Sequence, residues 1–460
     1  MRLYFLVLIL AASLAFVSLS SGVERGATTL VTPPWMHCLG LHKVTQFHLD
    51  AYSGYREKFV DPEGLFCMKL ASKDKPGTRR DDDELTVYGI NSGNGNIIYN
   101  KSFVSIGIVG GPGGGPMQFK NALALTGDKE GNLYIADTGN DRIAHLRYSD
   151  DELVWVKEIR GSGQRVLRSP SGVCLSGGRL YVADTENDRV VVFDPDGSMV
   201  ESFGAEFQGA SLFRPYAIAA VTSGDEFLYY GDHFIILTDS LGTRLWKLSP
   251  DGEALGLVRR SAIEGKGSFN HVAIDYYGNV YVTDREAGLI HKFDRHLSYI
   301  VAIGDRGSES GPHFDEPRGI SIYRRFGQIF VSERSGAQYF WIGADVLRYS
   351  AENLVFDPVR RRCGVDVSFQ LTECSTISLT LKDDEGKNRF TIIPTYMLPP
   401  GRFSKRIEVD CPAAADLAKC KLKLVLAAAP TYSSREYLTV ERDSRILVPR
   451  VCDLPPAGSP

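Results

Sequence analysis

The sequence predicts an all-β protein in which a ring of six repeated sheets is followed by a small β-sandwich. The first observation is an internal repeat, because the stretch Asn132–Ile143 returns almost unchanged as Arg179–Val190. Each copy alternates aliphatic and aromatic residues before a polar Asp-Thr-x-Asn segment, which is typical of a strand entering a tight turn. The second observation is turn content, with 46 glycines in 460 residues. The repeated unit is therefore a β-hairpin.

Degenerate copies of this hairpin continue the repeat along the chain. The middle of the first hairpin strand falls at Thr86, Tyr134, Tyr181, Ile236, Tyr281 and Phe330. These positions are roughly 45 to 55 residues apart, and such a period with several short strands per unit is typical of a β-propeller blade. Six copies predict six blades.

Each unit also has a strand before the hairpin and another after it. Proline marks the start of the first strand at Pro62, Pro170, Pro215 and Pro317. Asp-Gly follows the hairpin at Asp196–Gly197 and Asp251–Gly252, which is a strong signal for a second tight turn. The unit therefore contains four strands, as a propeller blade requires.

The pattern resembles the NHL repeat, whose units read roughly Pro-x-Gly-Ile-Ala-Val-Asp and then Gly-Asn-Leu-Tyr-Val-Ala-Asp-Thr-x-Asn-x-Arg-Ile. The second and third units match almost fully, the fifth matches well, and the others are degenerate. The resemblance spans about residues 60–350 and implies a six-bladed NHL-type β-propeller, which we place at 38–355. We expect a strand over Lys43–Leu49 to pair with the last blade and close the ring.

The acidic residue of the hairpin recurs once per unit, at Asp137, Asp184, Asp239 and Asp284. A carboxylate repeated in this way is a property of the repeat, and we interpret it as a turn cap. We expect these carboxylates to pair with Arg142, Arg189 and Arg244, and we assign no catalytic residue among them.

Beyond about residue 360 the period disappears. Short alternating strands follow at Val365–Leu371, Ile377–Lys382, Phe390–Ile393, Phe403–Val409 and Leu422–Leu426. They predict a small β-sandwich of immunoglobulin-like kind over residues 360–450. Five of the eight cysteines lie in the last hundred residues, so we expect disulfides there, with Cys411–Cys420 as the candidate pair. Residues 453–460 are expected to form a loose tail.

The N-terminus predicts export. One positive charge at Arg2 precedes an apolar run over Leu3–Val17 and then small residues, which indicates a signal peptide over 1–20. The run is short for a membrane span. We expect a secreted or extracytoplasmic protein, monomeric and without a membrane span. The formal net charge of −4 gives no reason to expect a nucleic-acid partner.

Candidate site residues come from the geometry of a propeller, whose innermost strands converge on a central channel. The position after the proline marker should face the channel mouth, and the offset from the hairpin strands gives it in each unit as Glu63, Asn121, Ser171, Tyr216, His271 and Arg318. All six are polar. Two interpretations stay open: a solvated mouth with polar loops, or a site for a ligand or ion.

Resemblance also suggests two metal chemistries at this mouth. The peptidyl-α-hydroxyglycine lyase domain resembles this repeat and holds zinc through histidines at this position, where the present chain has only His271. Lactonase-like propellers would place Glu63 and Asn121 around a divalent ion. Zinc catalysis usually needs three protein ligands, and Arg318 would repel a cation. We therefore predict no cofactor and keep Ca²⁺ or Zn²⁺ as the alternative.

Arg318 has two alternative roles. If the first and last blades are neighbours, Arg318 and Glu63 could form a structural ion pair across the closure. Left unpaired, Arg318 beside Tyr216 and His271 would suit a small anion or carboxylate. The sequence leaves this open.

The functional hypothesis is an exported binding scaffold. One propeller face would bind a protein or glycan, with the C-terminal sandwich as a spacer or second contact. The alternative is a metal-assisted lyase or hydrolase at the central channel.

Overall fold

The computed structural model describes residues 25–33, 42–54, 56–74, 85–102, 105–161, 166–304 and 312–451. The expected signal peptide over 1–20 and the tail over 453–460 lie outside these residues, as do Cys38 and Cys452. Within the described ranges, no helix has the length and apolarity that crossing a bilayer requires.

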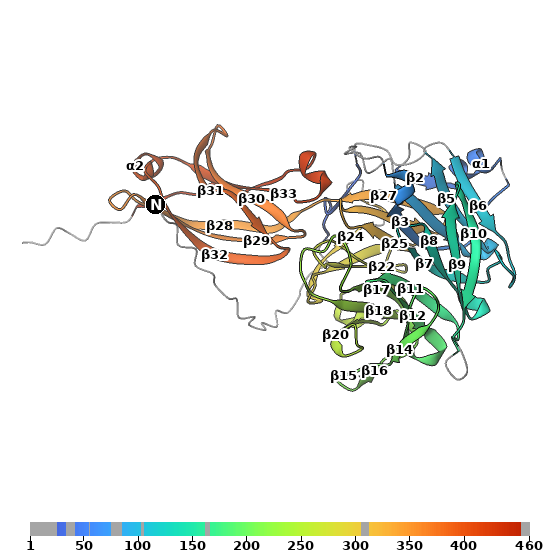
Figure 1. Ribbon diagram of the computed structural model, residues 1–460. Coiled ribbons are helices and arrows are strands. Elements are labelled where there is room, and N and C mark those ends of the chain that lie inside the picture. The colour runs from blue at the N-terminus through green and yellow to red at the C-terminus, as the bar shows by residue number, and fades with distance from the viewer. Residues whose placement is uncertain are drawn as a thin grey trace, which may run out of the picture.

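The N-terminal part of the described chain forms six antiparallel sheets that follow one another in sequence (Figure 1). The first sheet contains β3 (Pro62–Lys69), β4 (Leu85–Asn91), β5 (Asn96–Ser102) and β6 (Ser105–Gly110). The second contains β7 (Ala122–Gly127), β8 (Asn132–Asp137), β9 (Arg142–Ser149) and β10 (Glu152–Ile159). The third contains β11 (Pro170–Ser176), β12 (Arg179–Asp184), β13 (Arg189–Phe193) and β14 (Met199–Phe203). The fourth sheet contains β17 (Pro215–Val221), β18 (Phe234–Asp239), β19 (Arg244–Leu248) and β20 (Ala254–Arg259). The fifth contains β21 (Phe269–Ile274), β22 (Val280–Asp284), β23 (Leu289–Phe293) and β24 (Tyr299–Ile303). The sixth contains β25 (Ile320–Tyr323), β26 (Gln328–Glu333) and β27 (Gly336–Ile342). A short hairpin of two-residue strands, β15 (Glu206–Phe207) and β16 (Ala210–Ser211), lies between the third and fourth sheets.

The start of the chain completes the last of these sheets. Strands β1 (Leu30–Val31) and β2 (Lys43–Thr45) both pair with β27, so the outer edge of the sixth sheet is covered. The expected pairing of the 43–49 segment is confirmed for its first three residues. The remainder is the helix α1 (Gln46–Ser53), because the Thr45 amide donates to His48 Nδ1 at 3.1 Å and caps a helical turn.

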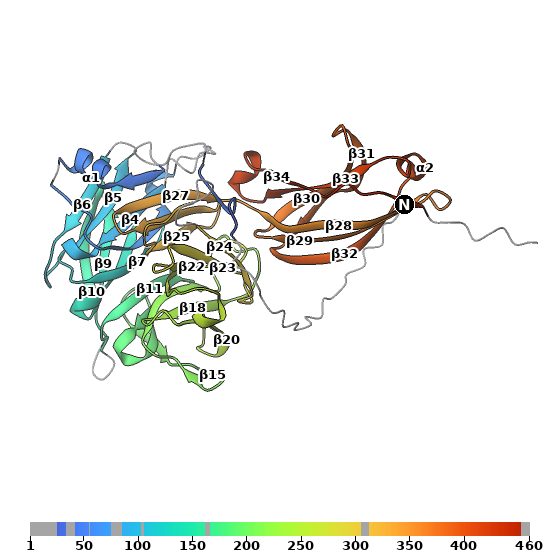
Figure 2. The ribbon, with the colours of Figure 1, turned by 180° about the vertical axis from the view of Figure 1, so that it is seen from behind.

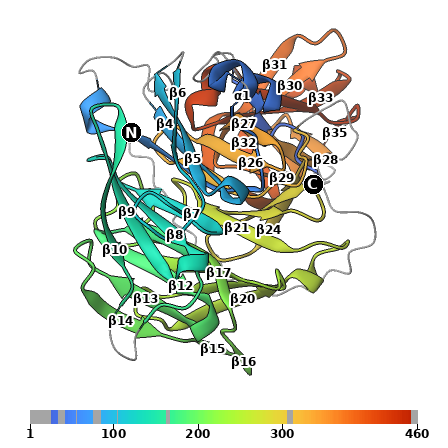
Figure 3. The ribbon, with the colours of Figure 1, turned by 90° about the vertical axis from the view of Figure 1, so that its right-hand side faces the viewer.

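Side-chain hydroxyls at the end of the second strand join one sheet to the start of the inner strand of the next, around most of the ring. The bonds run from Thr138 to Pro170 O, Thr185 to Pro215 O, Thr238 to Asn270 O, Thr283 to Arg318 O and Ser332 to Glu63 O, at 2.5 to 2.8 Å. The last of them links sheet six to sheet one, so the sheets close on themselves (Figure 3). Each such bond contributes about 1 kcal/mol.

The repeated carboxylates cap turns, as interpreted from the sequence. Asp137 Oδ2 accepts from Arg142 Nε at 2.7 Å, and its Oδ1 accepts from the Lys120 amide at 2.8 Å. Asp184 and Arg189 repeat the pair at 2.7 Å.

The fourth and fifth sheets vary the pattern. The expected Asp239–Arg244 pair is wrong: Asp239 accepts instead from the Thr243 hydroxyl and amide, both at 2.7 Å, and Arg244 donates to Ser211 O. Asp284 pairs with Arg260 at 2.9 Å.

The C-terminal part forms two further four-stranded sheets (Figures 1 and 2). One contains β28 (Val346–Asp357), β29 (Arg362–Leu371), β32 (Gly401–Asp410) and β35 (Arg450–Val451); the other contains β30 (Ser375–Asp383), β31 (Asn388–Leu398), β33 (Leu422–Pro430) and β34 (Val440–Asp443). Both sheets contribute to one apolar core. All five strands expected from the sequence lie within β29 to β33. The structure differs from the expected bound at 355, because β28 pairs with β29 and so belongs to this unit from Val346.

The expected Cys411–Cys420 disulfide is not formed, and the six described cysteines are free thiols. The short helix α2 (Ala414–Leu417) lies between the two residues, and Cys420 Sγ contacts Asp416 O at 3.5 Å. Cys411 instead lies near Cys363, because β29 and β32 pair with Cys363 opposite Val409. Cys174, in β11, is half-buried, and burial raises the pKa of its thiol to about 11, which fits a small hydrophobe better than a nucleophile.

The C-terminal unit contacts the fifth and sixth sheets. Gln370 Nε2 donates to Ile300 O at 2.6 Å, and the hydroxyls of Tyr277 and Thr431 are 2.6 Å apart. Figures 1 and 2, which show the molecule from opposite sides, place the two parts side by side. A buried charge cluster lies at this interface, where the turn between β29 and β30 inserts Glu373 against Lys292 of β23.

This buried cluster contains two carboxyl groups and one ammonium group, so one carboxylate has no counter-charge. Glu373, Lys292 and Asp275 are each fully buried. Asp275 accepts from the amides of Tyr277 and Asn279 at 2.9 and 2.8 Å. Burial and the neighbouring Glu373 raise the pKa of Asp275 to about 7, while Lys292 opposes the shift.

The raised pKa of Asp275 predicts a pH-dependent stability. In the unfolded chain this carboxyl loses its proton near its ordinary pKa of 3.8, whereas the folded protein keeps the proton until about pH 7. The folded state therefore binds more protons in this interval, and the contribution of Asp275 to stability falls as pH rises from about 4 to about 7. Urea midpoints measured across this range should fall more steeply for the wild type than for Asp275→Asn. Parallel pH profiles would contradict the assignment.

Candidate binding site at the channel mouth

The strand register identifies which residues begin each inner strand at the mouth. In the third sheet Val173 pairs with Val182, two positions before Asp184. The same pairing fixes the residues equivalent to Ser171 in the other sheets as Glu63, Leu123, Tyr216, Asn270 and Arg318. Asn121 therefore lies two residues before the equivalent position, and His271 one residue after it.

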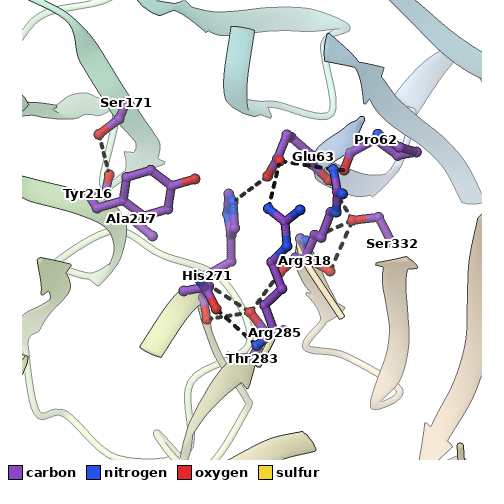
Figure 4. Close-up of polar contacts among 12 residues, drawn as sticks. Pro62, Glu63, Ser171, Tyr216, Ala217, His271, Thr283, Arg285, Arg318 and Ser332 are labelled. Carbon is purple, nitrogen blue, oxygen red and sulfur yellow. Dashed lines mark hydrogen bonds and ion pairs between the residues drawn. The ribbon is translucent and has the colours of Figure 1, made fainter. Parts of the chain in front are cut away.

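Glu63 is the centre of the mouth. Arg318 Nη1 lies 3.2 Å from Glu63 Oε1, and the same nitrogen donates to Pro62 O at 3.1 Å (Figure 4). His271 Nε2 lies 3.6 Å from the other carboxylate oxygen. Glu63, His271 and Arg318 are 8%, 7% and 2% exposed. The first and last sheets thus meet in a buried ion pair, which is the first of the two roles the sequence left open for Arg318.

Tyr216 and Ser171 complete the group on the side of the third and fourth sheets. The Tyr216 ring lies edge-to-face on His271, with centroids 5.6 Å apart at 71°. Ser171 Oγ donates to Tyr216 O at 2.9 Å. Burial, and then the charge of Glu63, raises the pKa of the Tyr216 hydroxyl, so this group stays a neutral hydrogen-bonding phenol.

Five of the six predicted residues are therefore brought together: Glu63, Ser171, Tyr216, His271 and Arg318 (Figure 4). Asn121 occupies an exposed bend with φ of 49°, a left-handed conformation that asparagine tolerates well. Asn121 belongs to the second sheet, whose first strand has no proline at its start. The offset from a proline that located Glu63, Ser171, Tyr216 and Arg318 therefore does not apply there.

Three charged residues at the mouth were not predicted. Arg285 Nη1 lies 3.8 Å from Glu63 Oε1, and its Nε lies 3.4 Å from Glu316 Oε2. Asp61 lies 3.3 Å from Arg318. A signal for Arg285 was present, because it replaces the threonine that follows the repeat aspartate in the second and third units.

Two buried nitrogens at the mouth have no hydrogen-bond partner among the described residues, namely His271 Nε2 and Arg318 Nε. An unsatisfied buried polar atom costs about 1–3 kcal/mol, so each of these nitrogens is a local cost to the stability of the mouth.

The donor set does not fit a metal. The described residues contain no cluster of three or more His, Cys, Asp or Glu side chains arranged to hold an ion. At the mouth, the only carboxylate beside His271 is Glu63, and two arginines neutralise it. Neither the zinc nor the calcium arrangement suggested by resemblance is present in these residues.

Breaking the central ion pair should destabilise the ring. We expect Arg318→Met to lower the free energy of unfolding by about 3 kcal/mol or more, because Glu63 would remain buried with only the more distant Arg285 and His271. The matched control is Arg334→Ala, whose side chain is 58% exposed in its contact with Asp315 and should cost less than about 1 kcal/mol. Equal shifts of the urea midpoint for the two variants would contradict this role.

Comparison with known proteins identifies the repeat. Residues 167–193 match the family model described as NHL repeat. No curated protein matches the chain.

Solved structures with a similar fold include a streptogramin B lyase, at 13% identity, with 62% of this chain and 96% of that one covered and a TM-score of 0.41. A catalytically inactive virginiamycin B lyase from Staphylococcus aureus, solved with quinupristin, is similar at 11% identity, 65% and 98% coverage and a TM-score of 0.41. A gluconolactonase from Xanthomonas campestris is similar at 12% identity, 68% and 99% coverage and a TM-score of 0.43.

The matched segment runs through β11, β12 and β13, the strands that contain the Asp184–Arg189 pair. The chain therefore contains an NHL repeat at residues 167–193, within a ring of antiparallel sheets.

Proposed function

We propose that this protein is an exported binding module, in which a six-bladed NHL propeller with an immunoglobulin-like C-terminal sandwich presents one propeller face to a protein or glycan. The observation that supports this most is the state of Glu63. A metal-assisted enzyme at this mouth would use Glu63 as a base or ligand, whereas Arg318 and Arg285 both lie against it.

The metal-assisted lyase or hydrolase is the weaker alternative. His271 and Glu63 are adjacent, which favours it, but the two arginines beside the carboxylate pair with it and repel a metal ion. A binding role needs no such group. Mixed donors and acceptors at a rigid rim suit polar recognition.

The test is to probe glycan and protein arrays with the purified full chain. We expect at least one ligand whose signal is competed by the same ligand in solution. The absence of any specific ligand on both arrays would contradict a binding role. N-terminal sequencing of protein recovered from the medium tests export, with a start near residue 21 expected; a chain retaining residue 1 inside the cell would contradict it.

A further inference from the structure

The end of the ring opposite the mouth has a cluster of tyrosines at its surface. The loop from 222 to 233, which joins β17 to β18, contains Tyr229 and Tyr230, and the next inner strand is followed by Tyr276 and Tyr277. Tyr229 is 47% exposed although it contacts all three other rings. An exposed aromatic ring held among others is a common feature of binding surfaces.

The orientation of Tyr229 is fixed by its neighbours. Its ring lies 4.9 Å from Tyr230 at 81° and 5.1 Å from Tyr277 at 52°. Its backbone amide donates to Tyr276 O at 2.9 Å, which ties the loop of the fourth sheet to that of the fifth. Tyr277 in turn packs on Tyr432 of the C-terminal unit, at 5.6 Å. A ligand would therefore meet a platform that loses little conformational entropy on binding.

An ion pair borders this platform. Arg295 lies over the Tyr230 ring at 3.7 Å and contacts Asp232 at 3.2 Å. Asp232 is 49% exposed in this contact, and Arg295 is 28% exposed. Together they offer acceptors and planar donors beside an aromatic face, with no net charge.

This chemistry fits a neutral sugar chain. The faces of a pyranose present C–H groups that pack on the electron-rich face of an aromatic ring, and adjacent hydroxyls match a carboxylate–guanidinium pair. The small size of the cluster also favours a sugar chain over a protein partner. A stable protein interface takes about 20–30 residues on each side, whereas Tyr229, Tyr230, Tyr276, Asp232 and Arg295 span a few sugar units.

We propose that these five residues form a site for a neutral oligosaccharide. The proposal rests on the binding role proposed above and assigns it a face and a ligand class. The C-terminal unit would then support the site, because Thr431 and Tyr432 contact Tyr277, which packs against Tyr229.

Calorimetric titration of the full chain with cellohexaose, xylohexaose, maltohexaose and chitohexaose tests the proposal. We expect at least one of these to bind. Tyr229→Ala should weaken that binding by about tenfold or more, because the ring is the main contact. The matched control is Tyr396→Ala, since Tyr396 is 54% exposed on the C-terminal unit and should leave affinity unchanged. Circular dichroism checks that each variant is folded.

The outcomes separate the two proposals. If none of the four sugars binds, the neutral-saccharide assignment is overturned, while a protein or acidic ligand found on the arrays would still support a binding role. If a sugar binds and Arg285→Ala at the mouth abolishes the binding while Tyr229→Ala does not, the location is overturned. Equal losses for Tyr229→Ala and Tyr396→Ala would overturn it as well.

Discussion

Replacing Asp137 with alanine is expected to lower the free energy of unfolding by about 3–5 kcal/mol. Asp137 is fully buried and Arg142 is 1% exposed, so the guanidinium would remain in the interior with only the more exposed carboxylate of Glu158 beside it. The variant also removes the acceptor of the Lys120 amide, at 2.8 Å. Urea unfolding followed by tryptophan fluorescence measures the loss.

Glu158→Ala is the matched control, because Glu158 also contacts Arg142, at 2.9 Å, but is 41% exposed. Its loss should cost less than about 1 kcal/mol, since an exposed carboxylate interacts weakly through water. A small effect of Asp137→Ala, comparable with the control, would show that the repeat aspartate does not stabilise the sheet and would reopen a chemical role for it.

Replacing Glu373 with alanine is the second change with a large expected effect. Lys292 would stay fully buried without the carboxylate that it contacts. The variant also removes acceptors for Tyr281 Oη and Asn279 Nδ2, at 3.2 and 3.3 Å. We expect a loss of about 3–5 kcal/mol, partly offset if Lys292 turns towards Asp275.

Glu373→Ala should also loosen the contact between the C-terminal unit and the ring. Limited proteolysis should cut the connection near residue 345 faster than in the wild type. Glu441→Ala is a suitable control, because Glu441 is 55% exposed and contacts Lys382 within the C-terminal unit. An unchanged urea midpoint for Glu373→Ala would mean that the buried pair contributes nothing net to docking.

The strands could be predicted because their pattern is local. Alternating residues and repeated turns fix where each hairpin of the ring lies, and the same alternation located five strands of the C-terminal unit. The bound at 355 failed for a related reason: Val346–Asp357 also alternates, and only its pairing with β29 shows which sheet it joins.

The mouth was predictable in part. Glu63 and Arg318 followed from their offset to a proline, but their contact joins residues 255 apart and depends on ring closure. Asn121 was misplaced because β7 has no proline at its start. Glu373 had no sequence signal, since its partner Lys292 is 81 residues away in another unit.

The metal content of the purified protein tests the central claim, that the mouth is a charge-paired end of a binding module and not a metal centre. Inductively coupled plasma mass spectrometry, with thermal unfolding in and out of chelator, gives the answer. We expect zinc and calcium well below one equivalent per chain and an unchanged unfolding temperature in chelator. One tightly held equivalent that disappears in His271→Ala or Glu63→Ala would contradict the account.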